Sequence, residues 1–187
     1  MIESLIEGQL WKVDRYFEPS RFRDIRNMYR KSRIDMSMTY DDRILTPWQN
    51  SPELQEIVVA EQARIEDIVK QKLTPQVAYV SIDLSGSAIM MHRLHPDIFV
   101  QVQIALCDKR CSSMDFAFCT DQSINEKSEL DYKPIRRIST YDSVSVEYAP
   151  NVASVYLNQP RSFVGMLGRV PENSIREVLV LSYMRLN

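Results

Sequence analysis

Histidine and cysteine are the residues of this chain that bind metals most readily, and all of them except Cys119 lie in two short pairs. His92 and His95 are three positions apart, and Cys107 and Cys111 are four positions apart. Two imidazoles and two thiolates can hold zinc, but this spacing matches no common zinc finger or zinc ribbon. We therefore interpret the cysteines as small buried hydrophobic residues or as inert thiols in a loop. Because the chain has 2 histidines, any chemistry that needs histidines on distant segments is excluded.

The composition excludes several classes of function. With 4 glycines, neither of the two common glycine-rich phosphate-binding motifs can be written anywhere in the chain. The formal charge is −2. An acidic stretch at 53–67 can complement the basic stretch 21–33, which favours a solvated basic face over the alternative of contact with nucleic-acid phosphates. No segment approaches the roughly 20 apolar residues of a membrane span. An odd number of cysteines, 3, favours a reducing compartment, and we expect the cytoplasm or a virion.

The periodicity of apolar residues changes once along the chain. Up to residue 75 it predicts helices that begin at Pro19 and Pro52, preceded by a short strand at Leu10–Val13, with Pro75 ending the second helix. From residue 76 the period is two, with turn residues between short runs. We therefore predict one mostly β domain of the α+β class over residues 1–187. It is a jelly roll, with 1–75 as helical support and 76–187 as strand-rich core. The predicted strands are Ala78–Leu84, Ile98–Leu106, Asp115–Cys119, Pro134–Ser139, Ser143–Tyr148, Ala153–Leu157, Ser162–Leu167 and Ile175–Tyr183, with a hairpin turn at Val170–Ser174.

Three segments in order then carry a resemblance. They are Met91-His92-Arg93-Leu94-His95-Pro96-Asp97 before a long strand, Asn158–Met166 with Phe163-Val164-Gly165-Met166, and Ser174–Leu179 with Arg176. This order resembles the iron(II)- and 2-oxoglutarate-dependent oxygenases of the prolyl-hydroxylase-like group, including short phage forms. The resemblance implies a double-stranded β-helix. It also implies an H-x-D motif, a distal histidine, and an arginine that binds the 2-oxoglutarate carboxylate.

The resemblance assigns one role to each of four positions, and two of them depart from the family. His92 falls on the first histidine and Arg176 on the cosubstrate arginine, but Leu94 stands at the carboxylate position and Val164 at the distal histidine. Aliphatic side chains offer no lone pair to a metal. We therefore expect no metal and no cofactor. If iron(II) does bind, His92, His95 and Asp97 are the candidate ligands. Arg176 either still binds a carboxylate ligand or pairs with an acid inside the protein.

These departures lead us to expect a catalytically inactive oxygenase-like domain. Its role would be structural or protein-binding, within a homo-oligomer or another assembly such as the neck, tail or baseplate of a tailed-phage virion. Two alternatives stay open. One is an active or atypical iron(II)/2-oxoglutarate dioxygenase that acts as a hydroxylase, which needs metal at His92. The other is a sensor of small anions or dicarboxylates, which needs Arg176.

Overall fold

The computed structural model describes residues 1–32, 38–40, 43–47, 51–89, 91–120 and 143–186. Its larger sheet is antiparallel and has the strand order β1-β2-β9-β6-β11-β5-β4-β3. A smaller antiparallel sheet has the order β10-β7-β8. The strands of the larger sheet are, in that order, Ile2–Ile6, Leu10–Val13, Ala153–Leu157, Val100–Ala105, Arg176–Arg185, Leu73–Asp83, Arg43–Pro47 and Met38–Tyr40; those of the smaller sheet are Ser162–Met166, Phe116–Thr120 and Val144–Val146.

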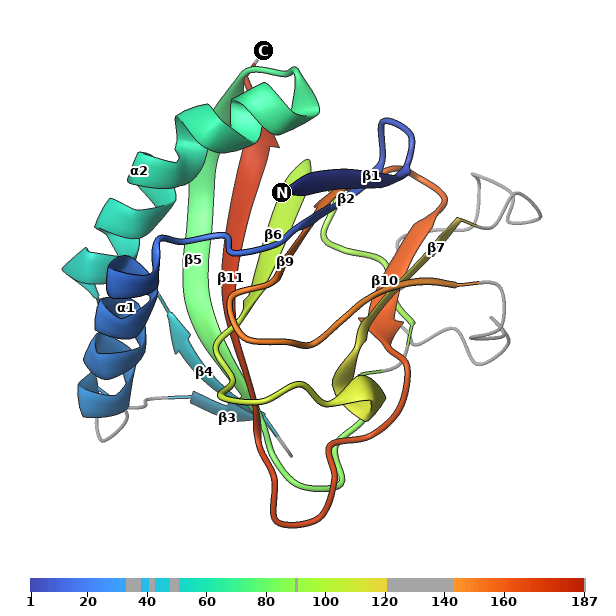
Figure 1. Cartoon of the computed structure of the whole chain (residues 1–187). Helices are drawn as coiled ribbons and strands as arrows, with labels where there is room; N and C mark the ends of the chain where they lie inside the picture. Colours follow the sequence, from blue (N-terminus) through green and yellow to red (C-terminus); the bar gives the residue numbers. More distant parts are fainter. Residues whose placement is uncertain (33–37, 41–42, 48–50, 90, 121–142, 187) are drawn as a thin grey trace.

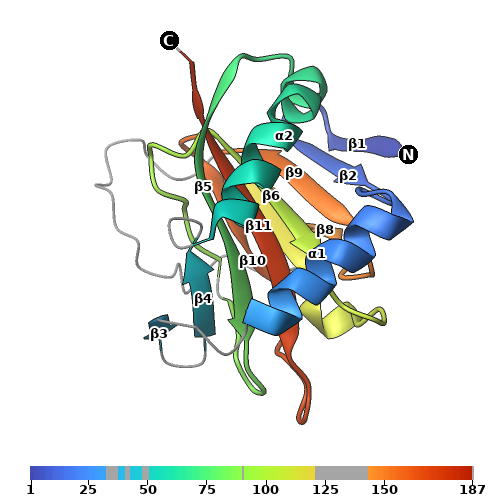
Figure 2. The same cartoon turned by 90° about the vertical axis from the view of Figure 1, so that its left-hand side faces the viewer.

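Two helices cover one face of the larger sheet, as Figure 2 shows. They are α1 (Pro19–Ser32) and α2 (Pro52–Val69). Helix α2 begins where the side chain of Ser51 accepts a hydrogen bond from the Leu54 N–H, and Pro52 occupies the first turn, where no N–H donor is needed. Alternate residues of β11 point towards the helices, and they join the largest hydrophobic core with the apolar stripes of both helices. Those residues are Leu179, Leu181 and Tyr183.

The smaller sheet lies across the other face of the larger one (Figure 1), so the two sheets enclose a second layer of core. Side chains from β7 and β10 meet side chains from β2 and β9 in that layer, among them Phe118, Val164, Leu10 and Tyr156. Two packed antiparallel sheets with helices on one outer face form the jelly roll that the sequence predicts. The fold class is therefore confirmed.

The first 75 residues contribute more than helical support. Strands β1 to β4 lie within them and extend the larger sheet at both of its edges. Helix α2 ends before Lys70, whose left-handed φ of 57° closes the helix, and not at Pro75 as predicted. Pro75 instead lies in β5, where the pairing with β11 shifts register between Ser182 and Tyr183. Proline is tolerated in a strand at such an irregularity because no regular ladder hydrogen bond is lost.

The segment Val170–Ser174 was predicted as a hairpin turn and is a crossover. It follows β10 of the smaller sheet and precedes β11 of the larger sheet, so the two strands it joins do not pair with each other. The predicted strand Pro134–Ser139 lies outside the described residues. Within the described ranges, no helix has the length and apolar character needed to cross a membrane.

Candidate functional site

His92 and Val164 lie directly opposite each other in the structure. The His92 N–H donates to the Val164 carbonyl and the Val164 N–H donates to the His92 carbonyl, each at 2.9 Å. Opposite residues of such an antiparallel bridge project their side chains to the same face. The first and distal histidine positions that the resemblance assigns are therefore adjacent in space, although they lie far apart in sequence.

Val164 and Leu94, at the distal histidine and carboxylate positions, lie among aliphatic and aromatic side chains. Val164 is buried, and Leu94 packs against the same cluster, which also contains Phe116 and Phe118 of β7. The Phe116 ring centroid lies 5.1 Å from that of Tyr156 on β9. In this cluster the dispersion and burial of apolar groups stabilise the fold. The residues at these positions do not fit an iron(II) ion in the conventional arrangement, because His92 alone of the three offers a lone pair.

His95 and Asp97 form a separate, exposed turn. The Asp97 N–H donates to His95 Nδ1 at 3.3 Å, and 51% and 65% of their side-chain surfaces are exposed. His92 is only partly exposed by comparison. Among the described residues, no group of three histidine, cysteine, aspartate or glutamate side chains is placed to hold a metal ion. The structure therefore does not gather His92, His95 and Asp97 into one ligand set.

Arg176 is held by protein groups on all three of its guanidinium nitrogens. Nη1 lies 2.9 Å from Asp83 Oδ2, Nε donates to the Met114 carbonyl at 3.3 Å, and Nη2 donates to Gln103 Oε1 at 3.3 Å. Arg176 and Asp83 are 3% and 1% exposed. The pairing follows from the sheet, because Arg176 and Asp83 are opposite residues in the register of β11 and β5. Of the two interpretations of Arg176, the pair with an internal acid is the arrangement seen.

A cavity of about 10 Å³ lies beside Arg176, lined also by Gln103, Ser154 and Tyr148. This is about the space that one water molecule needs. The Tyr148 O–H donates to the Glu177 carbonyl at 3.1 Å and accepts from the Glu177 N–H at 2.8 Å. Burial raises the pKa of Tyr148 above its usual range, so the phenol stays neutral and can serve both bonds. Neither Asp83 nor Tyr148 could be identified from the sequence. The register of β5 against β11 places Asp83 beside Arg176, and the tertiary fold brings the Tyr148 hydroxyl to Glu177.

Gly165, next to Val164, allows β10 to approach the segment before His92 closely. A Cβ at this position would lie 2.8 Å from both the Ile89 carbonyl oxygen and Met91 Sδ. We expect Gly165→Ala to lower the free energy of unfolding by about 1–3 kcal/mol through overpacking. Urea unfolding measures this, with Thr120→Ala at the exposed end of β7 as a control that changes little. An unchanged unfolding midpoint for Gly165→Ala would show that the two segments are not held this close.

The sequence matches no protein-family model, and no curated protein matches it either. Solved structures do. The epimerase SnoN from nogalamycin biosynthesis, in complex with Fe3+, alpha ketoglutarate and nogalamycin RO, has a TM-score of 0.75 at 11% identity, over 95% of this chain and 79% of that one. An oxidoreductase of the 2OG-Fe(II) oxygenase family from Burkholderia pseudomallei gives 0.72 at 15% identity, over 98% and 88%. HygX from Streptomyces hygroscopicus, with nickel and 2-oxoglutarate bound, gives 0.69 at 13% identity, over 95% and 83%.

At these identities the likeness concerns the fold. The chain has the fold of the 2OG-Fe(II) oxygenases, and the resemblance drawn from its three segments is confirmed at that level. The expectation that no cofactor belongs here is contradicted, because structures with this fold contain nickel or iron together with 2-oxoglutarate. That expectation was inferred from two positions, Leu94 and Val164, where aliphatic residues replace metal ligands, and it was applied to every possible cofactor site of the chain. The aliphatic side chains of Leu94 and Val164 show only that these two positions provide no metal ligand.

Proposed function

We propose that this chain is an oxygenase-fold domain that works as a protein-binding or structural module and does not activate oxygen at the conventional facial triad. One observation carries the proposal. Leu94 and Val164 contact one hydrophobic cluster at the two positions where the family places a carboxylate and a histidine. A facial triad needs two imidazoles and one carboxylate converging on the metal, and here His92 stands opposite a valine.

The buried polar groups around Arg176 support the same proposal. The guanidinium of Arg176 is engaged by Asp83, Gln103 and a backbone carbonyl, and the neighbouring cavity has the size of a water molecule. Buried ion pairs of this kind are disrupted only at a high cost in stability. An arginine engaged in this way stabilises the sheet, and this supports a role for the fold as a scaffold.

The experiment that tests the proposal is iron-dependent consumption of oxygen in the presence of 2-oxoglutarate. The purified full chain is supplied with iron(II), ascorbate and 2-oxoglutarate, and a 2-oxoglutarate oxygenase of known turnover serves as the positive control. We expect oxygen consumption by the chain to equal that of the buffer. Binding of 2-oxoglutarate is measured separately by calorimetry, so that cofactor binding and oxygen activation are distinguished.

We propose an assembly as the setting of this function, in the form of a homo-oligomer or a virion part such as a neck, tail or baseplate component. Two features support it. Strand β1 forms an edge of the larger sheet, and Ile2 on it is 52% exposed; exposed edges of this kind pair readily with other chains. Val59 on α2 and Leu186 after β11 are exposed as well. Light scattering on the purified chain tests whether it associates with itself. A monomeric mass would exclude the homo-oligomer and leave assembly with a different protein as the proposed setting.

A further inference from the structure

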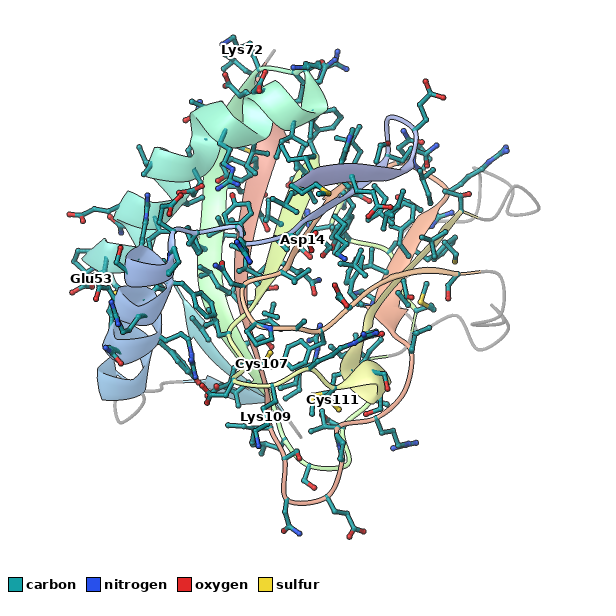
Figure 3. The ribbon with its side chains drawn as sticks, viewed as in Figure 1. Asp14, Glu53, Lys72, Cys107, Lys109 and Cys111 are labelled. Atoms are coloured by element: carbon teal, nitrogen blue, oxygen red, sulfur yellow. The ribbon has the colours of Figure 1, made fainter. Side chains whose placement is uncertain are left out.

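A groove of about 790 Å³ lies at the end of the molecule where the chain leaves β6 and enters the short 3-10 helix Ser112–Met114. Figure 3 shows Cys107, Lys109 and Cys111 near one another in this region, far from Lys72. The groove has the volume of a small-molecule site. It is lined by Cys107, Asp108, Lys109, Arg110, Cys111, Met114, Tyr148, Ser174, Ile175 and Glu177.

Glu177 lines this groove and is the largely buried acidic residue in it. It is 7% exposed, and its backbone N–H and carbonyl are both bonded to the Tyr148 hydroxyl. Its carboxylate, in contrast, has no hydrogen-bond donor or ion-pair partner in the part of the chain that the structure describes. Arg176 cannot supply one, because consecutive residues of a strand point to opposite faces and Arg176 points to Asp83. The carboxylate oxygens are not among the fully buried polar atoms that lack a partner, so they reach solvent through the groove and can pair there with a cation that enters it.

The other charged groups of the groove are largely engaged elsewhere. Asp108 forms an ion pair with Arg26 of α1. Arg110 Nη1 lies 3.5 Å from Glu147 Oε2. Burial raises the pKa of Cys107 to about 11, so that thiol is neutral near pH 7 and adds no second anion. Lys109 is exposed and forms no ion pair with Glu177 among the described residues. Glu177 is therefore the anion of the groove that remains open to a ligand.

We propose that this groove binds an organic cation, an alkylammonium or alkylguanidinium group, with the Glu177 carboxylate as its counter-ion. The walls suit the alkyl part of such a group, because Met114, Ile175 and the two thiols are apolar and line the same space. A charge-assisted hydrogen bond in a partly buried setting supplies the orientation. The cation can be a free amine or the lysine or arginine side chain of a protein, since both present the same group. Tyr148 lines both this groove and the small cavity beside Arg176, but the cation site uses the carboxylate of Glu177 and does not depend on the function proposed above.

Two probes test the site on the full chain by two-dimensional NMR of the methyl groups of Met114 and Ile175. Agmatine represents a free amine, and the capped peptide Gly-Gly-Lys-Gly-Gly represents a protein side chain. We expect at least one of them to give saturable shifts, and which one does so identifies the source. The same peptide with its lysine acetylated, and therefore neutral, is expected to give none.

Glu177→Gln keeps the shape of the side chain and removes its charge. We expect it to weaken binding of the responding probe by roughly ten-fold or more, since hydrogen bonds to charged groups are the stronger ones. Glu172→Gln, on the exposed turn before β11, is the matched control and leaves the affinity unchanged. A thermal melt of each variant shows that it is folded. The proposal is overturned if neither probe gives saturable shifts with the wild-type chain, or if Glu177→Gln binds as tightly as the wild type.

Discussion

Asp83→Ala lowers the free energy of unfolding by about 3–5 kcal/mol, because it leaves the Arg176 guanidinium charged and buried without its carboxylate. That is a large part of the roughly 5–15 kcal/mol that stabilises an ordinary domain. It corresponds to a loss of about 6–20 °C in melting temperature for a chain of this size. Urea unfolding and a thermal melt measure it. The size of the effect follows from burial, since both side chains are almost fully withdrawn from solvent.

Two controls separate the buried pair from charge in general. Combining Asp83→Ala with Arg176→Met removes both charges, and we expect it to restore a good part of the lost stability. Asp67→Ala breaks the ion pair between Asp67 and Lys70, whose side chains are 80% and 74% exposed respectively. We expect it to change the free energy of unfolding by less than about 1 kcal/mol. If Asp83→Ala proved as mild as Asp67→Ala, Arg176 would be free to turn to another partner, and its assignment as a structural residue would fail.

The double variant Leu94→Asp/Val164→His is expected to gain affinity for a divalent metal, because it places a carboxylate and an imidazole at the two positions that hold aliphatic side chains in the wild-type chain. His92 and Val164 project side by side from their bridge, and Leu94 packs on the same cluster as Val164, so the two replacements together with the native His92 complete two imidazoles and one carboxylate. We expect cobalt(II) affinity at least 100-fold above that of the wild type. Placing two polar groups in an apolar cluster costs about 1–3 kcal/mol each before metal is added.

Cobalt(II) absorption spectra and thermal melts with and without metal measure this gain. At a hundred times the dissociation constant, bound metal raises the stability by about 2.7 kcal/mol. His92→Ala in the same background serves as the control and removes the added affinity. If the double variant and its His92→Ala derivative bound cobalt equally, the three positions would not face a common point. The correspondence with the family's metal ligands would then be wrong.

Much of the fold could be predicted from local patterns. The strand Ala153–Leu157 agrees to the residue, and the helices begin at Pro19 and Pro52 as predicted, because each is marked by its own periodicity or by a proline in its first turn. Strands β1, β3 and β4 were missed. They are short, and their place in the larger sheet comes from pairing with distant strands, which no local pattern encodes.

The site divides in the same way. His92, Leu94, Val164 and Arg176 could be identified from three ordered segments, and the bridge between His92 and Val164 then places two of them together. Asp83 could not be identified, because only the register of β5 against β11 sets it opposite Arg176. Glu177 likewise follows from the alternation of β11, which turns it away from Arg176 and into a groove formed by separate loops.

The formation of succinate from 2-oxoglutarate by the wild-type chain is the most direct measurement of whether this oxygenase fold activates oxygen at its conventional site. The chain is loaded with iron(II) and supplied with ascorbate and oxygen, and succinate is counted per chain. With Leu94 and Val164 at two of the three ligand positions, we predict less succinate than one molecule per chain above the buffer. Repeated turnover that His92→Ala abolishes would contradict the account and assign the chain an oxygenase activity.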